Sequence, residues 1–269
     1  MTPHCLTTCF PRLPMMILAL LALALQGCGD GVRILPSDAD PSGYYNRDGH
    51  ADVDDGASGT RKIENLQALV NGDRIMMMST AEGLLYDGTI TSINGDDFTA
   101  DFTIYTDGDN PIDAKASGTI TTGSLITGTL TGNGVGSGIF TLQYASTNDD
   151  MADISRIENV VGVNETWQAL IGGAIIEQEF VVNNEGVITH DTISGGGIFS
   201  NCDLNGKITP ISRSSLYNVN VRLMDCSSGG GGANGTYTGL ATSRTDSSQD
   251  DVLLFAVANG RYSPNADFQ

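Results

Sequence analysis

The chain has 269 residues, of which 32 are acidic and 13 basic, so its formal net charge at pH 7 is −19. Binding to nucleic acid or to anionic lipid needs basic patches, and this balance of charge argues against both. We therefore expect no nucleic-acid partner. The acidic excess instead favours solubility and divalent cations.

The first 27 residues are predicted to be a signal peptide. Arg12 precedes an uninterrupted apolar run from Met15 to Leu25, and small residues follow the run, as in secretory leaders. Eleven helical residues reach about half of the ~30 Å hydrocarbon core, which is too short for a stable transmembrane helix. Removal of the leader takes away one basic residue and no acid, which leaves a mature formal charge of −20.

The leader ends in the tetrapeptide Leu25-Gln26-Gly27-Cys28. It resembles the lipobox of bacterial lipoproteins, although Gln26 departs from the residue usual there. The resemblance implies that Cys28 carries diacylglycerol, that cleavage occurs before it, and that the new amino terminus is acylated, for example with palmitate. Because Gly29 stands where an Asp would signal inner-membrane retention, the resemblance implies a lipid anchor in the outer membrane, on either face. The competing interpretation is an ordinary secretory signal with an incidental cysteine.

Residues 28–60 are predicted to be a lipidated, flexible and acidic tether. They are rich in Gly, Ser, Pro and Asp and have almost no apolar periodicity. Such a segment cannot bury enough apolar surface to offset the entropy lost on ordering. As a random coil it would hold the folded domain about 30 Å from the lipid.

A calcium site is a candidate within this tether. The stretch from Asn46 to Asp54 resembles part of the Asp-x-Asp-x-Asp-Gly calcium loops, since oxygen ligands alternate around Gly49. The candidate metal ligands are Asn46, Asp48, Asp52 and Asp54. Tyr44 stands at the first ligand position, where an Asp belongs, so a solvated acidic segment without metal is the competing interpretation. No other cofactor is predicted.

Residues 61–269 are predicted to form half-buried β-strands. Apolar and polar residues alternate over 98–104, 217–223 and 253–257, and turn signals such as Asn94-Gly95 and Asn205-Gly206 separate such stretches. The pattern predicts an all-β fold, an antiparallel barrel or sandwich of about 8–12 strands. A first β half is expected over 61–148 and a second, containing a disulfide, over 149–269.

Two short internal repeats leave the number of β units open. Ile63-Glu64-Asn65 returns as Ile157-Glu158-Asn159, and Gly88-Thr89-Ile90-Thr91 returns as 118–121. Duplicated halves predict one larger barrel or two lobes. Such strings are also common in β proteins without duplication.

Cys202 and Cys226 are the two thiols expected to remain in the mature chain, because Cys5 and Cys9 leave with the leader and Cys28 is lipidated. An isolated pair in an oxidising compartment predicts a disulfide. The loop of about 25 residues that it closes is worth about 3 kcal/mol in the chain-entropy model. A redox or zinc site would need closer spacing or more ligands.

Residues 186–258 resemble the carboxy-terminal part of poorly characterised lipoproteins of Gram-negative bacteria. The likeness rests on both cysteines and on the stretches 186–189, 216–219, 234–242 and 250–253. It implies a small β-barrel-like domain with a strand-to-strand disulfide, and it implies no known activity. The lone Trp167 resembles the Trp of lipocalin-like barrels, which keeps a ligand-binding interior open beside ordinary core packing.

No catalytic residue is predicted. The mature chain has only His50 and His190 and no Gly-x-Ser-x-Gly elbow. The polar residues after His190 would alternate between the faces of a strand and so would not build a triad. We therefore expect a non-catalytic binding or structural role in the cell envelope, with an envelope protein as partner. A lipocalin-like carrier of a small apolar ligand and a calcium-stabilised adhesin are the alternatives.

Overall fold

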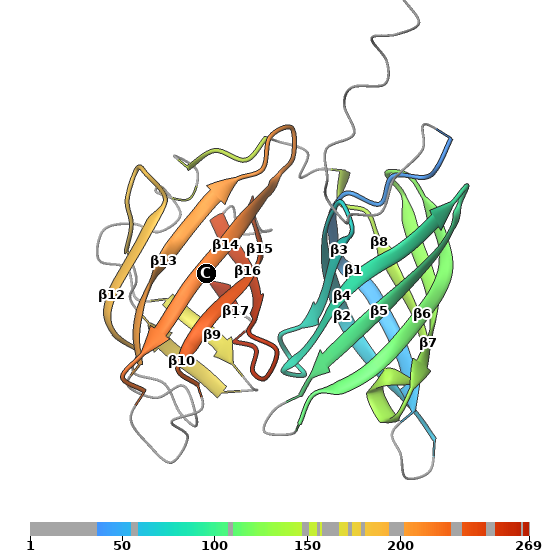
Figure 1. Cartoon of the computed structure of the whole chain (residues 1–269), viewed down its shortest axis with the longest axis horizontal. Coiled ribbons are helices and arrows are strands. Elements are labelled where there is room, and N and C mark those ends of the chain that lie inside the picture. The colour runs from blue at the N-terminus through green and yellow to red at the C-terminus, as the bar shows by residue number, and fades with distance from the viewer. Residues whose placement is uncertain are drawn as a thin grey trace, which may run out of the picture. The chain divides into compact units, whose positions relative to one another are not determined.

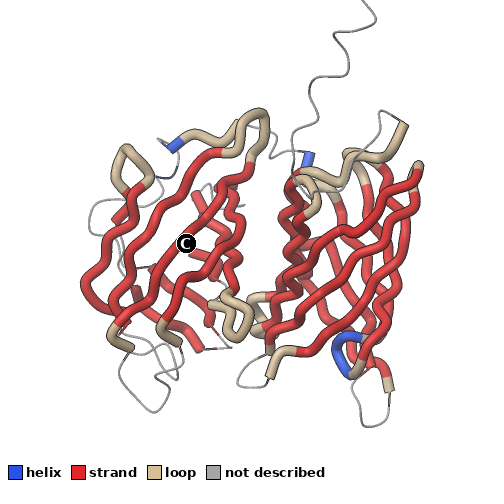
Figure 2. The backbone as a smooth tube through the Cα atoms, in the orientation of Figure 1, coloured by secondary structure: helices blue, strands red, loops and turns tan. Residues whose placement is uncertain are grey.

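The computed structural model describes residues 37–54, 59–106, 110–146, 151–154, 157, 167–171, 174–178, 181–193, 202–226, 233–245, 251–264 and 266–268. These residues contain 17 strands, and all strand pairs are antiparallel. The predicted all-β antiparallel fold is confirmed (Figures 1 and 2). There are more strands than the 8–12 expected because the chain builds a closed barrel and two further sheets.

The first eight strands form the closed barrel in sequence order, and β1 also pairs with β8 to complete it. Each strand therefore has a partner on both sides, which leaves the barrel without an open edge. The strands are β1 (Gly43–Asp54), β2 (Thr60–Asn71), β3 (Arg74–Ser79), β4 (Leu84–Asn94), β5 (Asp97–Tyr105), β6 (Ile112–Thr121), β7 (Leu125–Gly132) and β8 (Gly138–Gln143).

The interior of the barrel is filled by its own side chains. Alternate residues of every strand point inward and form one buried cluster, as the two-residue period of a strand requires. A Cβ atom on Gly88 would overlap the ring of Phe102, and one on Gly128 would lie 2.6 Å from the ring of Phe140. Both glycines therefore make room for an aromatic ring.

At each end of the barrel a residue from outside the strands packs against the interior cluster. At one end Ala39 is buried in the interior cluster, and its N–H donates to the Gly95 carbonyl at 2.8 Å. At the other end the short 3₁₀ helix η1 (Gly134–Gly136) brings Val135 against the same cluster, and the Tyr86 hydroxyl donates to the Val135 carbonyl at 2.9 Å.

The prediction of a flexible tether over residues 28–60 is wrong for residues 38–54. Residues 43–54 form β1, whose Ala51 and Val53 are buried in the barrel, and the first β half therefore begins at Gly43 rather than at 61. Register shifts between Tyr45 and Gly49 and between Gly49 and Ala51 interrupt the alternation of apolar and polar residues. The stability of β1 comes from pairing with β2 and with the distant β8, and a local pattern does not reveal that pairing.

The second half forms a two-stranded and a seven-stranded sheet with a separate core, so the chain contains two β assemblies. Ile63 is buried in the barrel and Ile157, its counterpart in the internal repeat, in the second core. The two-stranded sheet consists of β9 (Trp167–Ile171) and β10 (Ala174–Gln178). The seven-stranded sheet consists, in spatial order, of β11 (Val181–Val182), β12 (Val187–Ile193), β13 (Cys202–Pro210), β14 (Leu216–Met224), β15 (Gly235–Thr245), β16 (Asp251–Ala258) and β17 (Ala266–Phe268).

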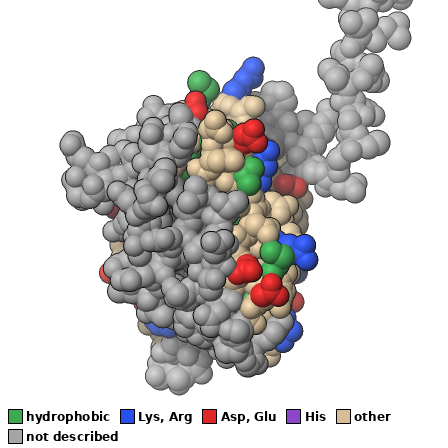
Figure 3. All heavy atoms as spheres, turned by 90° about the vertical axis from the view of Figure 1, so that its left-hand side faces the viewer, with side chains coloured by type: hydrophobic (Ala, Val, Ile, Leu, Met, Phe, Trp, Pro, Cys, Tyr) green, Lys and Arg blue, Asp and Glu red, His purple; other side chains and the backbone are tan. Residues whose placement is uncertain are grey.

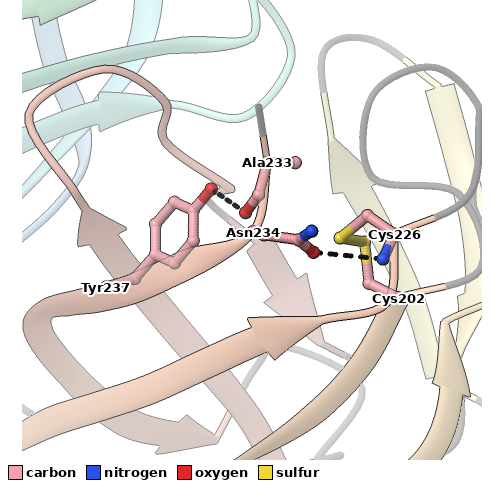
Figure 4. Close-up of a disulfide and its surroundings, with 5 residues drawn as sticks. All are labelled: Cys202, Cys226, Ala233, Asn234 and Tyr237. Carbon is pink, nitrogen blue, oxygen red and sulfur yellow. Dashed lines mark hydrogen bonds between the residues drawn. A yellow bond between two sulfur atoms is a disulfide. The ribbon is translucent and has the colours of Figure 1, made fainter. Parts of the chain in front are cut away.

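The predicted disulfide is confirmed. Cys202 begins β13 and Cys226 follows β14, the neighbouring strand, and their sulfur atoms are bonded (Figure 4). The Asn234 side-chain oxygen accepts a hydrogen bond from the Cys226 N–H at 3.1 Å. The disulfide therefore joins the ends of β13 and β14, and the hydrogen bond connects this point to the residues that lead into β15.

A third buried cluster combines residues of both assemblies. Met76 and Met78 point away from the barrel interior, and Leu254 and Ala256 point away from the second core, yet all four are buried. The full cluster is Tyr44, Leu69, Met76, Met78, Leu85, Tyr105, Ala145, Leu216, Leu240, Leu254, Ala256 and Ala258. Strands β3 and β16 therefore bury both of their faces, which explains their continuous apolar runs.

A buried tyrosine hydroxyl stabilises the start of one strand in each assembly. Tyr45 donates to the Pro41 carbonyl at 2.9 Å and Tyr237 donates to the Ala233 carbonyl at 2.7 Å, four residues back in both cases (Figure 4 for Tyr237). Burial is the main cause that raises the pKa of each phenol above its ordinary value of 10.0. The fold therefore holds both hydroxyls in the neutral, donating form.

Replacing Tyr45 with Phe tests this hydrogen bond. We expect the free energy of unfolding at pH 7 to fall by about 1 kcal/mol, because one buried hydrogen bond is lost. The raised pKa means that the unfolded chain ionises first as the pH rises above 10, so the wild type loses stability there. Above pH 10 the free energy of unfolding of Tyr45→Phe should fall by about 1.4 kcal/mol less per pH unit than that of the wild type, because the variant lacks this phenolic proton. Urea titrations at pH 7, 10 and 11 measure both effects, and parallel pH profiles would contradict the assignment.

Candidate functional site: a polar groove on the barrel wall

A groove of about 640 Å³ lies along the outside of β4–β7. It forms where outward side chains of adjacent strands meet in register: Thr89, Asp101, Lys115 and Thr131 make one row across the sheet, and Asp87, Thr103 and Asp113 make the next. The inward neighbours of these residues belong to the barrel core. The same alternation therefore fills the barrel and builds the groove.

Two carboxylates of the groove form ion pairs. Lys115 Nζ lies 2.7 Å from Asp101 Oδ1, and both side chains are largely exposed. Arg74 contacts both carboxylate oxygens of Asp87 at 3.2 and 3.3 Å and also donates to the Thr238 carbonyl at 3.0 Å. The second pair is partly buried, with side-chain exposures of 29% and 23%.

Asp87 is the carboxylate most affected by its surroundings. Burial raises its pKa above the ordinary 3.8, although the charge and hydrogen bonds of Arg74 act in the opposite direction. A raised pKa means that this group contributes most to stability below pH 3.8, and that the contribution is lost as the pH rises through the folded-state pKa. Arg74 is therefore the group that stabilises the charged form of this carboxylate against burial.

Asp113 gives the groove its net charge. Three carboxylates and one cation, Lys115, line the groove, and Arg74 of β3 pairs with Asp87. Within the described part of the chain no ion pair to Asp113 is found. Carboxylates accept hydrogen bonds from ammonium and hydroxyl groups, and threonine hydroxyls both donate and accept. The lining residues include neither His nor Cys. The groove is thus suited to hold a polar or cationic group.

The candidate calcium ligands lie on β1. Asn46 and Asp48 are adjacent to a bulge and bond each other at 3.1 Å, whereas Asp52 and Asp54 lie further along the strand. An extended strand spaces them along its length rather than wrapping them around one point. Among the described residues no cluster of three or more His, Cys, Asp or Glu side chains suited to a metal occurs.

Other predicted positions fall outside the description. Cys28 lies before residue 37, and the side chains of Trp167 and His190 are not described, although their backbones belong to β9 and β12. The groove itself was missed by sequence reasoning. Its signal was present as polar residues at alternate, outward positions of three consecutive strands: Asp and Thr on β4 and β5, and Asp and Lys on β6.

Large hydrophobic residues form no continuous patch on the described surface. Ile139 and Met151 are the two that are strongly exposed there, at 55% and 69%. On the face drawn in Figure 3 the coloured hydrophobic side chains lie singly among charged and polar ones. Within the described residues no helix is both long and apolar enough to span a membrane.

No protein-family model matches the sequence, and a comparison with curated proteins finds no match. Among solved structures, Aeromonas veronii immune modulator A is similar over 86% of this chain and 96% of its own, with 10% sequence identity and a TM-score of 0.34. We draw no functional argument from this degree of similarity.

The two ion pairs predict different responses to mutation. Asp87→Ala should lower the free energy of unfolding by about 2 kcal/mol, because it leaves a partly buried guanidinium without its carboxylate. Asp101→Ala, the matched control in the same groove, should change it by less than about 1 kcal/mol, because its partner is exposed to solvent. Urea unfolding at pH 7 makes the comparison. Equal losses in the two variants would show that burial does not distinguish these pairs.

Proposed function

We propose that this protein is an exported lipoprotein of the bacterial outer membrane that acts without catalysis, by binding a partner in the cell envelope with the outside of its β assemblies. The observation that carries the proposal is the filled and closed barrel, in which side chains occupy the space that a carrier would give to its ligand. The groove over Asp87, Asp101 and Asp113 offers a polar surface for such a partner.

The proposed anchor rests on Leu25-Gln26-Gly27-Cys28 and on the short apolar run before it. Several acyl chains bind a membrane stably, whereas a single chain is marginal. The Cys202–Cys226 bond supports an oxidising compartment, since structural disulfides persist there. The proposed lipid anchor and the disulfide are therefore both consistent with a protein exported from the cytoplasm.

The two alternatives gain less support. A lipocalin-like carrier needs a cavity, and the barrel interior is occupied by rings such as those of Phe102 and Phe140. A calcium-stabilised adhesin would need its ligands gathered, and Asn46, Asp48, Asp52 and Asp54 are spread along β1. A non-catalytic, polar binding surface is the function that the described geometry supports best.

Replacing Cys28 with Ala tests the anchor. We expect the variant to lose metabolic labelling by a palmitate analogue and to leave the membrane fraction, because the acyl chains that hold it are absent. Cys9→Ala, which changes a cysteine of the predicted leader, is the matched control and should be labelled and retained like the wild type. Unchanged labelling and membrane retention of Cys28→Ala would refute the lipoprotein proposal.

A further inference from the structure

We propose that the barrel stands end-on to the lipid surface, with the end that carries the β2–β3, β4–β5 and β6–β7 turns facing the membrane. We call this the anchored end, and we call the end with η1 the distal end. The inference deepens the proposed function and rests on the lipidation of Cys28. It concerns which face of the protein meets lipid and which is left open to a partner.

Four hydrogen bonds hold residues 38–41 at the anchored end. Asp38 accepts from the Gly95 N–H at 3.0 Å, and the Ala39 N–H donates to the Gly95 carbonyl, so both contact the β4–β5 turn. The Asp40 N–H donates to the Thr122 hydroxyl in the β6–β7 turn at 2.9 Å. The Tyr45 hydroxyl holds the Pro41 carbonyl. The chain therefore enters the barrel at a defined place.

The length of chain between lipid and barrel is short. Asp38 is ten residues after Cys28, and ten residues span at most about 36 Å in any conformation. The 12 residues of β1 extend about 40 Å, and a strand tilt of about 40° makes the barrel about 30 Å high. To bring the distal end to the membrane, the chain would have to be almost fully extended along the barrel wall. A chain of this length favours the anchored end.

The charge at the anchored end indicates which lipid it meets. Asp38, Asp40, Asp73, Asp96 and Asp97 surround this end, and the adjacent Arg74 is paired with Asp87. Anionic lipid would repel these carboxylates. The occupant of this face is therefore a zwitterionic lipid surface, held near by the acyl chains and not by basic side chains.

The orientation leaves the groove accessible from the side away from the membrane. Asp113 lies one residue after the start of β6 and Thr131 one residue before the end of β7, and both of these strand ends belong to the distal end. A partner that binds there would approach from the space beyond the lipid surface. The anchor and the groove thus use opposite parts of the barrel.

Energy transfer to lipid tests the orientation. Asp97→Cys at the anchored end and Asn133→Cys at the distal end are both exposed positions, and Asn133 makes no side-chain cap to η1. Each acylated full-length variant is labelled with a donor dye, and the introduced thiol is the reactive one because Cys202 and Cys226 are bonded. The proteins are reconstituted in phosphatidylcholine vesicles that contain an acceptor-labelled lipid.

We expect clearly stronger transfer from position 97 than from position 133. As a control, insertion of 20 Gly and Ser residues after Gly31 should reduce the difference, because a longer chain lets the barrel rotate. Equal or reversed transfer in the acylated protein would overturn the end-on orientation. Absence of palmitate labelling would instead refute the lipid anchor itself, so the two failures are distinguishable. Matching melting temperatures of the labelled variants show that each one is folded.

Discussion

The packing of two aromatic rings against two glycines inside the barrel is the contact on which the rest of the structure depends. Phe102 occupies the space above Gly88, and Phe140 occupies the space above Gly128. Truncation of a buried Phe to Ala typically costs about 3–5 kcal/mol, which is a large part of the stability of a domain. With Ala39 at one end and Val135 at the other, these rings leave the barrel as a packed core. The binding role proposed above therefore falls to the outer surface of the barrel.

That outer surface divides into an apolar and a polar part. Tyr44, Leu69, Met76, Met78 and Leu85 are buried in the cluster shared with β14–β16, whereas the outward side chains that line the groove on β4–β7 are polar. The two parts meet at Asp87 and Tyr105. Burial is the main cause that raises the pKa of Tyr105, and the charge of Asp87 raises this pKa further. A hydrogen bond with the Gly260 backbone acts in the opposite direction and lowers the pKa. Arg74 also serves both parts, since it pairs with Asp87 and bonds the Thr238 carbonyl.

Much of the fold was predictable from local patterns, and the errors have specific causes. The alternation at Phe98–Ile104 and Tyr217–Leu223 correctly predicted two strands, and the two remaining thiols correctly predicted the disulfide. Residues 43–54 were misassigned because β1 is stabilised by β8, almost ninety residues away in sequence. The shared apolar cluster had a visible signal in Ile75-Met76-Met77-Met78 and Leu253–Ala258, whose continuous apolar runs exceed what one buried face requires. The alternate Asp and Thr residues of the groove were visible in the sequence, but their meeting in one groove depends on the register between strands, which a local pattern does not give.

Binding of a small apolar probe tests most directly whether the barrel is filled. A benzene-sized fluorescent aromatic is titrated into the wild type and into Phe140→Ala under conditions where both are folded. The account predicts no saturable binding to the wild type and one-to-one binding to the variant, because an apolar cavity opened in a packed core stays dry and accepts such a molecule. Saturable one-to-one binding to the wild type, displaced by longer apolar ligands, would contradict the account and favour a carrier.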